Sequence, residues 1–314
     1  MRCRAYRYAA TCTGCKWPRP AAGPGWATAY RRFSCAPGGT GFSLCIMSAL
    51  PSPADLVDLK RYPIDNLSSP AARELARHCR RQLDETGACE LPDFLTPDAV
   101  AMLVREGDAL SPLAYHSVVT GTAYLEVPDK SWPADHPRRH FDQTSVGVIA
   151  YDQFPAHSAL RRLYEWDVLM EFIAAAIGKD RLYRYADPMG ALNLAVMGDG
   201  ERLHWHYDQT DFVTSIALRA SERGGDFEYV PLIRSAGDEN YPRVKQLFDG
   251  SMDGVVRVPM HPGTLLLFEG RNSIHRVTPI HGNTTRLVAL LAYDTKPGTR
   301  SSKTLQMARY GRTA

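Results

Sequence analysis

Hydrophobic positions in the first half of the chain recur at helical spacing. Apolar residues four apart follow a Ser69-Pro70 cap and stop at Gly87, which predicts a helix over about 70–86. A Thr96-Pro97 cap predicts a second helix. A third apolar stripe runs from 158 to 177 and ends at a glycine, so we expect a core-facing supporting helix there.

Beyond residue 181 the pattern changes to short strands separated by Gly, Pro, Asp and Asn. The expected strands are Leu182–Ala186, Ala191–Met197, Phe212–Leu218, Phe227–Val230, Gly254–Pro259, Thr264–Phe268, Ile274–Ile280 and Arg286–Tyr293. Before residue 181, a short strand is expected at 88–91, a strand or hairpin at 115–127, and a loop at 132–137. Between the later strands, a short helix is expected at 241–248.

About eight short strands with turn signals predict a sandwich or barrel, and a double-sheet jelly roll commonly holds metal at its mouth. The predicted fold class is therefore mainly β with flanking helices (α+β). Its core is a double-stranded β-helix, the jelly roll of cupin-like proteins, with N-terminal supporting helices.

Charge and cysteine content divide the chain near residue 46. Residues 1–46 hold seven basic and no acidic residues, so the remainder carries 37 − 7 = 30 basic against 34 acidic groups, about −4. That balance removes the electrostatic argument for binding nucleic acid. The sequence also lacks a run of about 18 apolar residues, so a membrane span is not expected. Five of the seven cysteines lie in the first 45 residues, and the rest is typical of a reduced, cytoplasmic protein.

We expect residues 1–46 to be a disordered extension outside the folded domain, with Met47 as the natural start. A transit peptide shares the Arg-rich, acid-poor composition, but Pro and Gly interrupt any amphipathic helix. One domain is expected over 47–314, with supporting elements over 47–180, the jelly-roll core over 181–295 and a tail over 296–314.

The candidate chemistry begins with His206 and Asp208. Residues two apart on a strand point to the same face, so with one distant histidine, His275, they can form a two-histidine, one-carboxylate triad around a metal. Such a set suits Fe(II) and leaves adjacent coordination positions open for a co-substrate and dioxygen. By itself an H-x-D motif is weak in a chain with ten histidines.

The order of motifs after Asp208 strengthens this assignment. Gly224-Gly225, Pro262-Gly263, His275 and Arg286 follow in turn, and this order resembles the iron(II)/2-oxoglutarate-dependent oxygenases. More narrowly, His204-Trp205-His206-Tyr207-Asp208 and the residues around 224–229 and 275–279 are similar to the BesD/HalD-type group, which includes free amino-acid halogenases. The resemblance implies that His206, Asp208 and His275 bind iron and that Arg286 binds 2-oxoglutarate.

The chemistry of a guanidinium supports the role of Arg286. A dicarboxylate that chelates iron at one end leaves the other carboxylate buried, and a planar, permanently charged group is its best partner. The alternative is that Arg286 is an ordinary charged residue at the end of a strand, with no role in binding. Thr278 is expected to add a hydrogen bond to the co-substrate. Asn193 either faces the cleft to orient co-substrate or substrate, or is a satisfied interior amide.

One departure from the halogenases bears on the reaction. In that group a small residue, commonly Gly, replaces the carboxylate ligand and leaves a position for chloride, whereas this chain has Asp208. Hydroxylation is therefore expected, with desaturation, ring closure and halogenation as alternatives.

The narrow resemblance implies a free polar or cationic amino acid, with Arg138 or Arg139 as partners of its carboxylate, although both also suit a solvated basic turn. His204 is either a group beside the metal site or substrate, or a packed rim histidine. A peptidyl hydroxylase and a cupin-like metal-binding protein without oxygen activation remain alternatives, and the second has no need of Arg286. The oligomeric state is not predicted.

Overall fold

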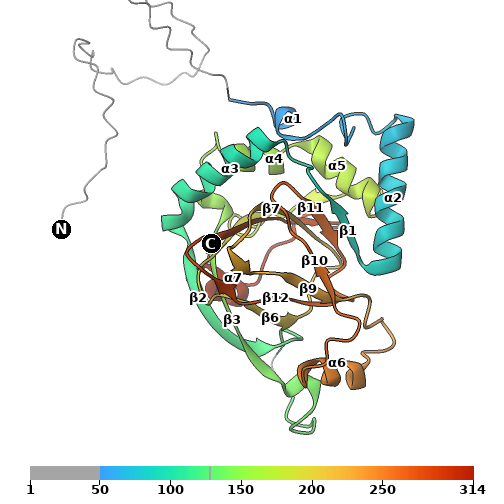
Figure 1. Ribbon diagram of the computed structural model, residues 1–314, viewed down its shortest axis with the longest axis vertical. Coiled ribbons are helices and arrows are strands. Elements are labelled where there is room, and N and C mark those ends of the chain that lie inside the picture. Colours follow the sequence, from blue (N-terminus) through green and yellow to red (C-terminus); the bar gives the residue numbers. More distant parts are fainter. Residues whose placement is uncertain (1–49, 127–128) are drawn as a thin grey trace, which may run out of the picture. The chain divides into compact units, whose positions relative to one another are not determined.

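The computed structural model describes residues 50–126 and 129–314, so the predicted extension 1–46 lies outside the described residues. Eight strands form a jelly roll whose chain passes repeatedly between two antiparallel sheets (Figure 1). The larger sheet contains β5 (Leu192–Met197), β7 (Val213–Arg219), β11 (Leu265–Phe268) and β14 (Arg286–Leu291). The smaller sheet contains β6 (Leu203–His206), β9 (Phe227–Val230), β10 (Val256–Val258) and β12 (Ile274–Val277). The predicted fold class is confirmed.

The strand order explains why distant motifs meet. It is β1-β11-β7-β14-β5-β3-β2 in the larger sheet and β10-β9-β12-β6 in the smaller one, so β6 and β12 are neighbours although about 70 residues separate them. The larger sheet gains β1 (Ala88–Leu91) at one edge and the hairpin of β2 (Tyr115–Thr122) and β3 (Phe141–Ile149) at the other. The sequence predicts β1 and β2 but not β3, whose apolar residues do not alternate strictly.

The central strands of the larger sheet are buried on both faces. All six residues of β5 are buried, and Leu192, Leu194 and Val196 point into the main hydrophobic core under the helices. Met197 lies on the opposite face and packs with Val277 and Ile280, between the sheets. This two-sided burial gives β5 the continuous apolar run that its sequence shows.

The helices before the jelly roll cover the outer face of the larger sheet (Figure 1). Their bounds are α1 Pro53–Leu56, α2 Pro70–Thr86, α3 Pro97–Leu110, α4 Ala159–Tyr164 and α5 Asp167–Ala176. The predicted caps are confirmed: the Ser69 hydroxyl accepts from the amide of Ala72, the Thr96 hydroxyl accepts from Ala99, and Gly87 ends α2 with φ 73°.

The single helix expected over 158–177 is wrong, because the chain breaks between α4 and α5. The carbonyls of Tyr164 and Glu165, which would continue the helical ladder, instead accept hydrogen bonds from Arg184 at 3.1 and 2.6 Å. Trp166 between the helices is extended. A tertiary contact from a distant arginine therefore overrides the local apolar stripe.

The remaining elements are short. They are the 3₁₀ turns Ser111–Leu113, Pro137–Arg139 and Tyr151–Gln153, the strands β4 Tyr183–Arg184, β8 Arg223–Gly224, β13 Ile280–His281 and β15 Tyr293–Asp294, and the helices α6 Tyr241–Phe248 and α7 Lys303–Tyr310. The last helix lies in the segment expected to be a tail, and it packs against β2 and β3. Within the described residues, every helix is too short or too polar to cross a membrane.

Candidate metal centre

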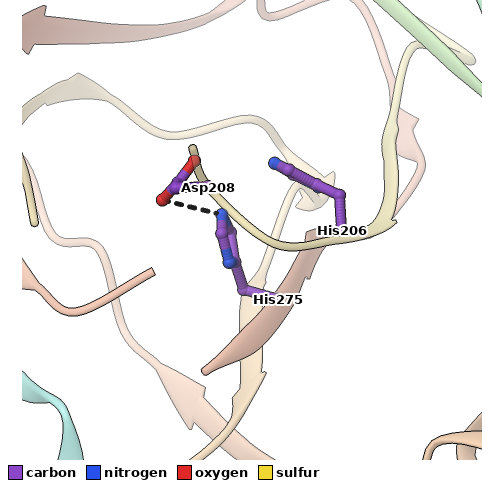
Figure 2. Close-up of side chains that lie close together, drawn as sticks. All are labelled: His206, Asp208 and His275. Atoms are coloured by element: carbon purple, nitrogen blue, oxygen red, sulfur yellow. Dashed lines mark ion pairs between the residues drawn. The ribbon is translucent and has the colours of Figure 1, made fainter. Parts of the chain in front are cut away.

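Three predicted ligands converge at one end of the smaller sheet. His206 ends β6, and His275 lies directly opposite it on β12. One ligand atom each from His206, Asp208 and His275 lies within 4.8 Å of the other two (Figure 2). The Nε2 atom of His275 is 3.5 Å from Oδ2 of Asp208, and the two imidazole centroids are 4.2 Å apart. The separation of these groups allows one ion to contact all three.

Backbone carbonyls orient both imidazoles in the same way. Nδ1 of His206 donates to the carbonyl of His204 at 2.7 Å, and Nδ1 of His275 donates to that of Ser273 at 3.0 Å. In each case the acceptor is two residues earlier in the chain. A proton held on Nδ1 leaves the lone pair of Nε2 free, which is the form that binds a metal. Burial also lowers the pKa of His206 well below its usual value, helped by the charge of His275.

Gly270 makes room for the carboxylate of Asp208. The amide of Asp208 donates to the Gly270 carbonyl at 3.0 Å, so the two backbones run close together. A Cβ atom at position 270 would lie 1.7 Å from Oδ2 of Asp208. Gly270 is not among the glycines with positive φ, so space rather than backbone conformation requires glycine here. The sequence offers no signal for this residue, because the contact spans about 60 positions.

Among the described residues, Arg286 is a buried cation with no acidic side chain within ion-pair distance. It begins β14 opposite Met197, and only 6% of its surface is exposed. Met197 packs with Val277, two residues beyond His275 on the same face of β12, so Arg286 faces the space between the sheets. Its one polar contact within the described residues is from Nη1 to Met197 Sδ at 3.8 Å. Burial lowers the pKa of Arg286 to about 10, opposed by the more distant Asp226.

Burying a charged guanidinium without a partner destabilises the folded protein unless an anion binds to it. The Gly224-Gly225 turn keeps its surroundings open: both glycines have positive φ, and a Cβ atom at Gly225 would lie 3.0 Å from Cδ of Arg286. The two convergent imidazoles, one carboxylate and this unpaired cation fit an Fe(II) ion with 2-oxoglutarate.

Two other predicted co-substrate residues have partners within the chain. The Thr278 hydroxyl accepts from the amide of Asp226 at 3.0 Å, which joins the end of β12 to the start of β9. The amide nitrogen of Asn193 donates to the carbonyls of Met189 and Leu192, and its oxygen accepts from the Tyr310 hydroxyl at 2.9 Å. Asn193 therefore matches the interior-amide alternative, and its hydrogen bonds leave no support for a co-substrate role.

His204 does not follow the strict alternation of side chains expected along a regular strand. The register between β6 and β12 shifts between His275 and Val277, so a bulge interrupts the alternation on β6. The His204 ring is buried, with Nδ1 at 2.5 Å from the Thr144 hydroxyl on β3. It acts on the metal site through its carbonyl, which holds His206.

Arg138, predicted to bind a substrate carboxylate, has several partners within the chain. Nε donates to the Tyr241 hydroxyl at 2.6 Å, Nη2 pairs with Glu239 at 3.2 Å, and Nη1 pairs with Glu126. Its guanidinium also lies 4.6 Å from the centre of the Tyr124 ring. Two carboxylates already neutralise it, so its geometry supports a structural role at the β2–β3 hairpin.

Arg139, the neighbouring candidate, donates from Nη1 to the carbonyl of Trp132 at 2.8 Å. This bond ties the 3₁₀ turn to the hairpin loop. Both arginines thus have partners within the chain, and the contact of either one with a substrate stays a prediction.

Comparisons with known proteins agree with this geometry. The family model described as halogenase D matches residues 71–309. The carbocyclase SnoK of nogalamycin biosynthesis, described as non-heme and alpha ketoglutarate dependent, is 15% identical with a TM-score of 0.52; the match covers 77% of this chain and 94% of that one. AviO1 from Streptomyces viridochromogenes is 16% identical with a TM-score of 0.50, covering 72% of this chain and 98% of that one. No curated protein matches the sequence.

Proposed function

The chain belongs to the halogenase D family, and from that membership and its site we propose that it hydroxylates a small polar molecule, with a free amino acid as the expected substrate. It is an iron(II)- and 2-oxoglutarate-dependent oxygenase. The observation that carries the proposal is the combination of three convergent metal ligands with Arg286, a buried guanidinium that the described residues leave without an acidic partner.

The residues of the chain divide the work of binding. His206 and His275 offer Nε2 atoms fixed by backbone carbonyls, and Asp208 offers a carboxylate. Arg286 would bind the far carboxylate of 2-oxoglutarate through charge-assisted hydrogen bonds, away from water. A cupin-like protein that only binds metal would leave this cation uncompensated. When bound, iron and 2-oxoglutarate supply the activation of dioxygen, with release of succinate and CO2.

The protein also limits water around the metal ligands. The rings of Phe227 and Phe268 lie 5.5 and 4.9 Å from that of His275, and Phe227 packs edge-on against Phe268. An apolar wall of this kind strengthens electrostatic interactions in the site and disfavours side reactions with solvent.

Asp208 favours hydroxylation over halogenation. With a metal bound, its carboxylate would take the position that a halide needs, and Gly270 leaves room for that carboxylate. In the related halogenases a smaller residue leaves that position free, so this chain has the ligand set of a hydroxylase within a family described by halogenation.

Turnover with candidate substrates tests the proposal. The purified protein with Fe(II), 2-oxoglutarate and air should release succinate in proportion to a product one oxygen heavier, for at least one member of a panel of free amino acids. The Asp208→Ala variant should release none above background. Coupled turnover with peptides alone would replace the amino acid by a peptidyl substrate, and a chlorinated product from the wild type would refute hydroxylation. A cytoplasmic location remains a prediction.

A further inference from the structure

Arg286 and Met197 lie side by side on two paired strands. They are register partners on β14 and β5, and side chains directly opposite one another on paired strands lie on the same face of the sheet. Sδ of Met197 is 3.8 Å from Nη1 of Arg286, which is the one polar contact of that guanidinium among the described residues. Met197 is 0% exposed. It is therefore a fully buried neighbour of the cation that is proposed to bind 2-oxoglutarate.

Met197 also belongs to a small apolar cluster with Val277 and Ile280. All three residues are at most 4% exposed, so the cluster closes one end of the space between the sheets. His275 lies near the start of β12, Val277 ends that strand, and Ile280 follows it in the chain. The cluster thus lies at the opposite end of β12 from the metal ligand.

The aliphatic stem of Arg286 has little room to move. A Cβ atom at Gly225 would lie 2.8 Å from Cδ1 of Ile280 and 3.0 Å from Cδ of Arg286, so the backbone of that turn lies against the stem. Met197 contacts the guanidinium at the end of the stem. Protein interiors are close-packed, and a side chain between such neighbours keeps one position. Packing therefore fixes the depth of the guanidinium in the space between the sheets.

A guanidinium at fixed depth can select a co-substrate by its length. In the proposed function, a 2-oxo diacid chelates the metal at one end and reaches Arg286 with its far carboxylate. Both attachment points are fixed, so only one chain length satisfies both of them without strain. A diacid with one more methylene has to push the guanidinium back, into space that the side chain of Met197 fills.

We propose that Met197 makes the site selective for 2-oxoglutarate over 2-oxoadipate, its homologue with one more methylene, by fixing the depth of the Arg286 guanidinium. The inference rests on the proposed function, because it takes the co-substrate to be a 2-oxo diacid. Met197 is a positioning residue in this account, since its side chain acts through Arg286. An unbranched thioether suits the role, because it fills irregular space and accepts weakly from a guanidinium.

The test measures binding without turnover. Each protein is loaded with Fe(II) under anaerobic conditions and titrated separately with 2-oxoglutarate and 2-oxoadipate, while the weak visible charge-transfer band of the chelate is followed. The wild type should need about 10- to 200-fold more 2-oxoadipate to form half of the band, the range expected for one methylene that does not fit. The readout is the ratio of the two concentrations, because a loss of folded protein lowers both signals alike and leaves the ratio unchanged.

Three substitutions of Met197 vary the length of its side chain. Met197→Val should narrow the ratio by about tenfold or more, because the shorter side chain lets the guanidinium withdraw, and valine is well suited to a strand. Met197→Ile, which shortens the side chain less, should narrow the ratio less. Met197→Leu has nearly the same volume and should keep most of the wild-type ratio. If Met197→Leu narrows the ratio as much as Met197→Val does, side-chain length is not the cause and the inference is wrong.

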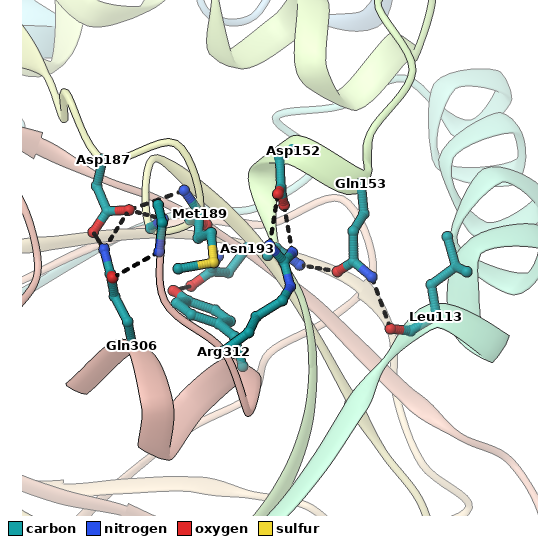
Figure 3. Close-up of polar contacts among 12 residues, drawn as sticks. Leu113, Asp152, Gln153, Asp187, Met189, Asn193, Gln306 and Arg312 are labelled. Carbon is teal, nitrogen blue, oxygen red and sulfur yellow. Dashed lines mark hydrogen bonds and ion pairs between the residues drawn. The ribbon is translucent and has the colours of Figure 1, made fainter. Parts of the chain in front are cut away.

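Met189→Val is the matched control. Met189 is also 0% exposed, but it packs with Tyr310 in a separate apolar cluster. It lies among the polar contacts around α7 (Figure 3), where its amide and that of Ser301 donate to the Asp187 carboxylate at 2.9 and 2.8 Å. The substitution shortens an equally buried methionine and leaves these backbone contacts in place. Its ratio should therefore equal that of the wild type.

The outcomes separate this inference from the proposed function. If the wild type binds both acids equally, or if Met197→Val keeps the wild-type ratio, Met197 does not set selectivity and the inference is wrong, while the oxygenase assignment stands. A folded wild type that forms no band with either acid would overturn the oxygenase assignment and the inference together.

Discussion

Substitution of Gly270 by alanine should damage the metal centre as much as loss of Asp208 itself. The new Cβ would lie 1.7 Å from Oδ2, 2.6 Å from Cγ and 3.0 Å from Cβ of Asp208. Ordinary contact begins near 3.4 Å, so the nearest oxygen must move by about 3.4 − 1.7 = 1.7 Å. Carboxylate bonds to metals tolerate only about 0.2 Å of change. The displaced carboxylate would then no longer reach an ion held by His206 and His275.

The metal affinity should fall by at least roughly 10- to 100-fold, which is the loss typical when a group that hydrogen-bonds to a metal ligand is removed. Anaerobic titration of the apoprotein with Co(II), followed by its visible absorption, measures this affinity without turnover. Asp208→Ala and the double variant are the controls: once the carboxylate is absent, Gly270→Ala should cause no further loss. Wild-type affinity in Gly270→Ala, or additive losses in the double variant, would refute the steric argument.

Three further predictions follow from the described contacts. Arg286→Gln should weaken 2-oxoglutarate binding by at least about 100-fold by isothermal titration while the thermal stability holds or rises, because an uncompensated buried charge is removed; unchanged affinity would contradict the assigned role. Asp208→Gly at high chloride should give some chlorinated product by mass spectrometry; its absence, with the metal bound, would show that an open position is insufficient. Folding lowers the pKa of Asp187 from 3.8 to about 2, so its ionised carboxylate contributes about 2 kcal/mol to the free energy of unfolding above pH 4, and this contribution is lost as the pH falls toward 2. The free energies of unfolding of the wild type and of Asp187→Asn, measured by chemical denaturation, should therefore converge between pH 4 and pH 2. A constant difference between the two proteins over that range would contradict the stabilising role of the Asp187 carboxylate.

The metal ligands could be predicted because their geometry is local. His206 and Asp208 are two residues apart, and the distal His275 lies on a strand with its own turn signals. Seven of the eight jelly-roll strands match expected ranges, since each is a short apolar run between turn residues, whereas β6 (Leu203–His206) is not among the ranges expected as strands. The burial of Arg286 also follows from the apolar run that it begins.

The rest depends on contacts that sequence patterns do not encode. A bulge opposite Val277 changes where His204 points, and two glutamates far apart in the chain neutralise Arg138. Arg184 splits the expected long helix, and a buried carboxylate folds the expected tail back as α7. Each of these involves residues separated by many positions, so no local period reveals them.

The most direct measurement of the central claim is the anaerobic absorption spectrum of the protein with one equivalent each of Fe(II) and 2-oxoglutarate. A weak visible band should form in the wild type and be absent in His206→Ala, and Arg286→Gln should need far more 2-oxoglutarate to form it. A folded wild-type protein without the band, or a band that persists unchanged in His206→Ala, would contradict the assignment of this site to iron and 2-oxoglutarate.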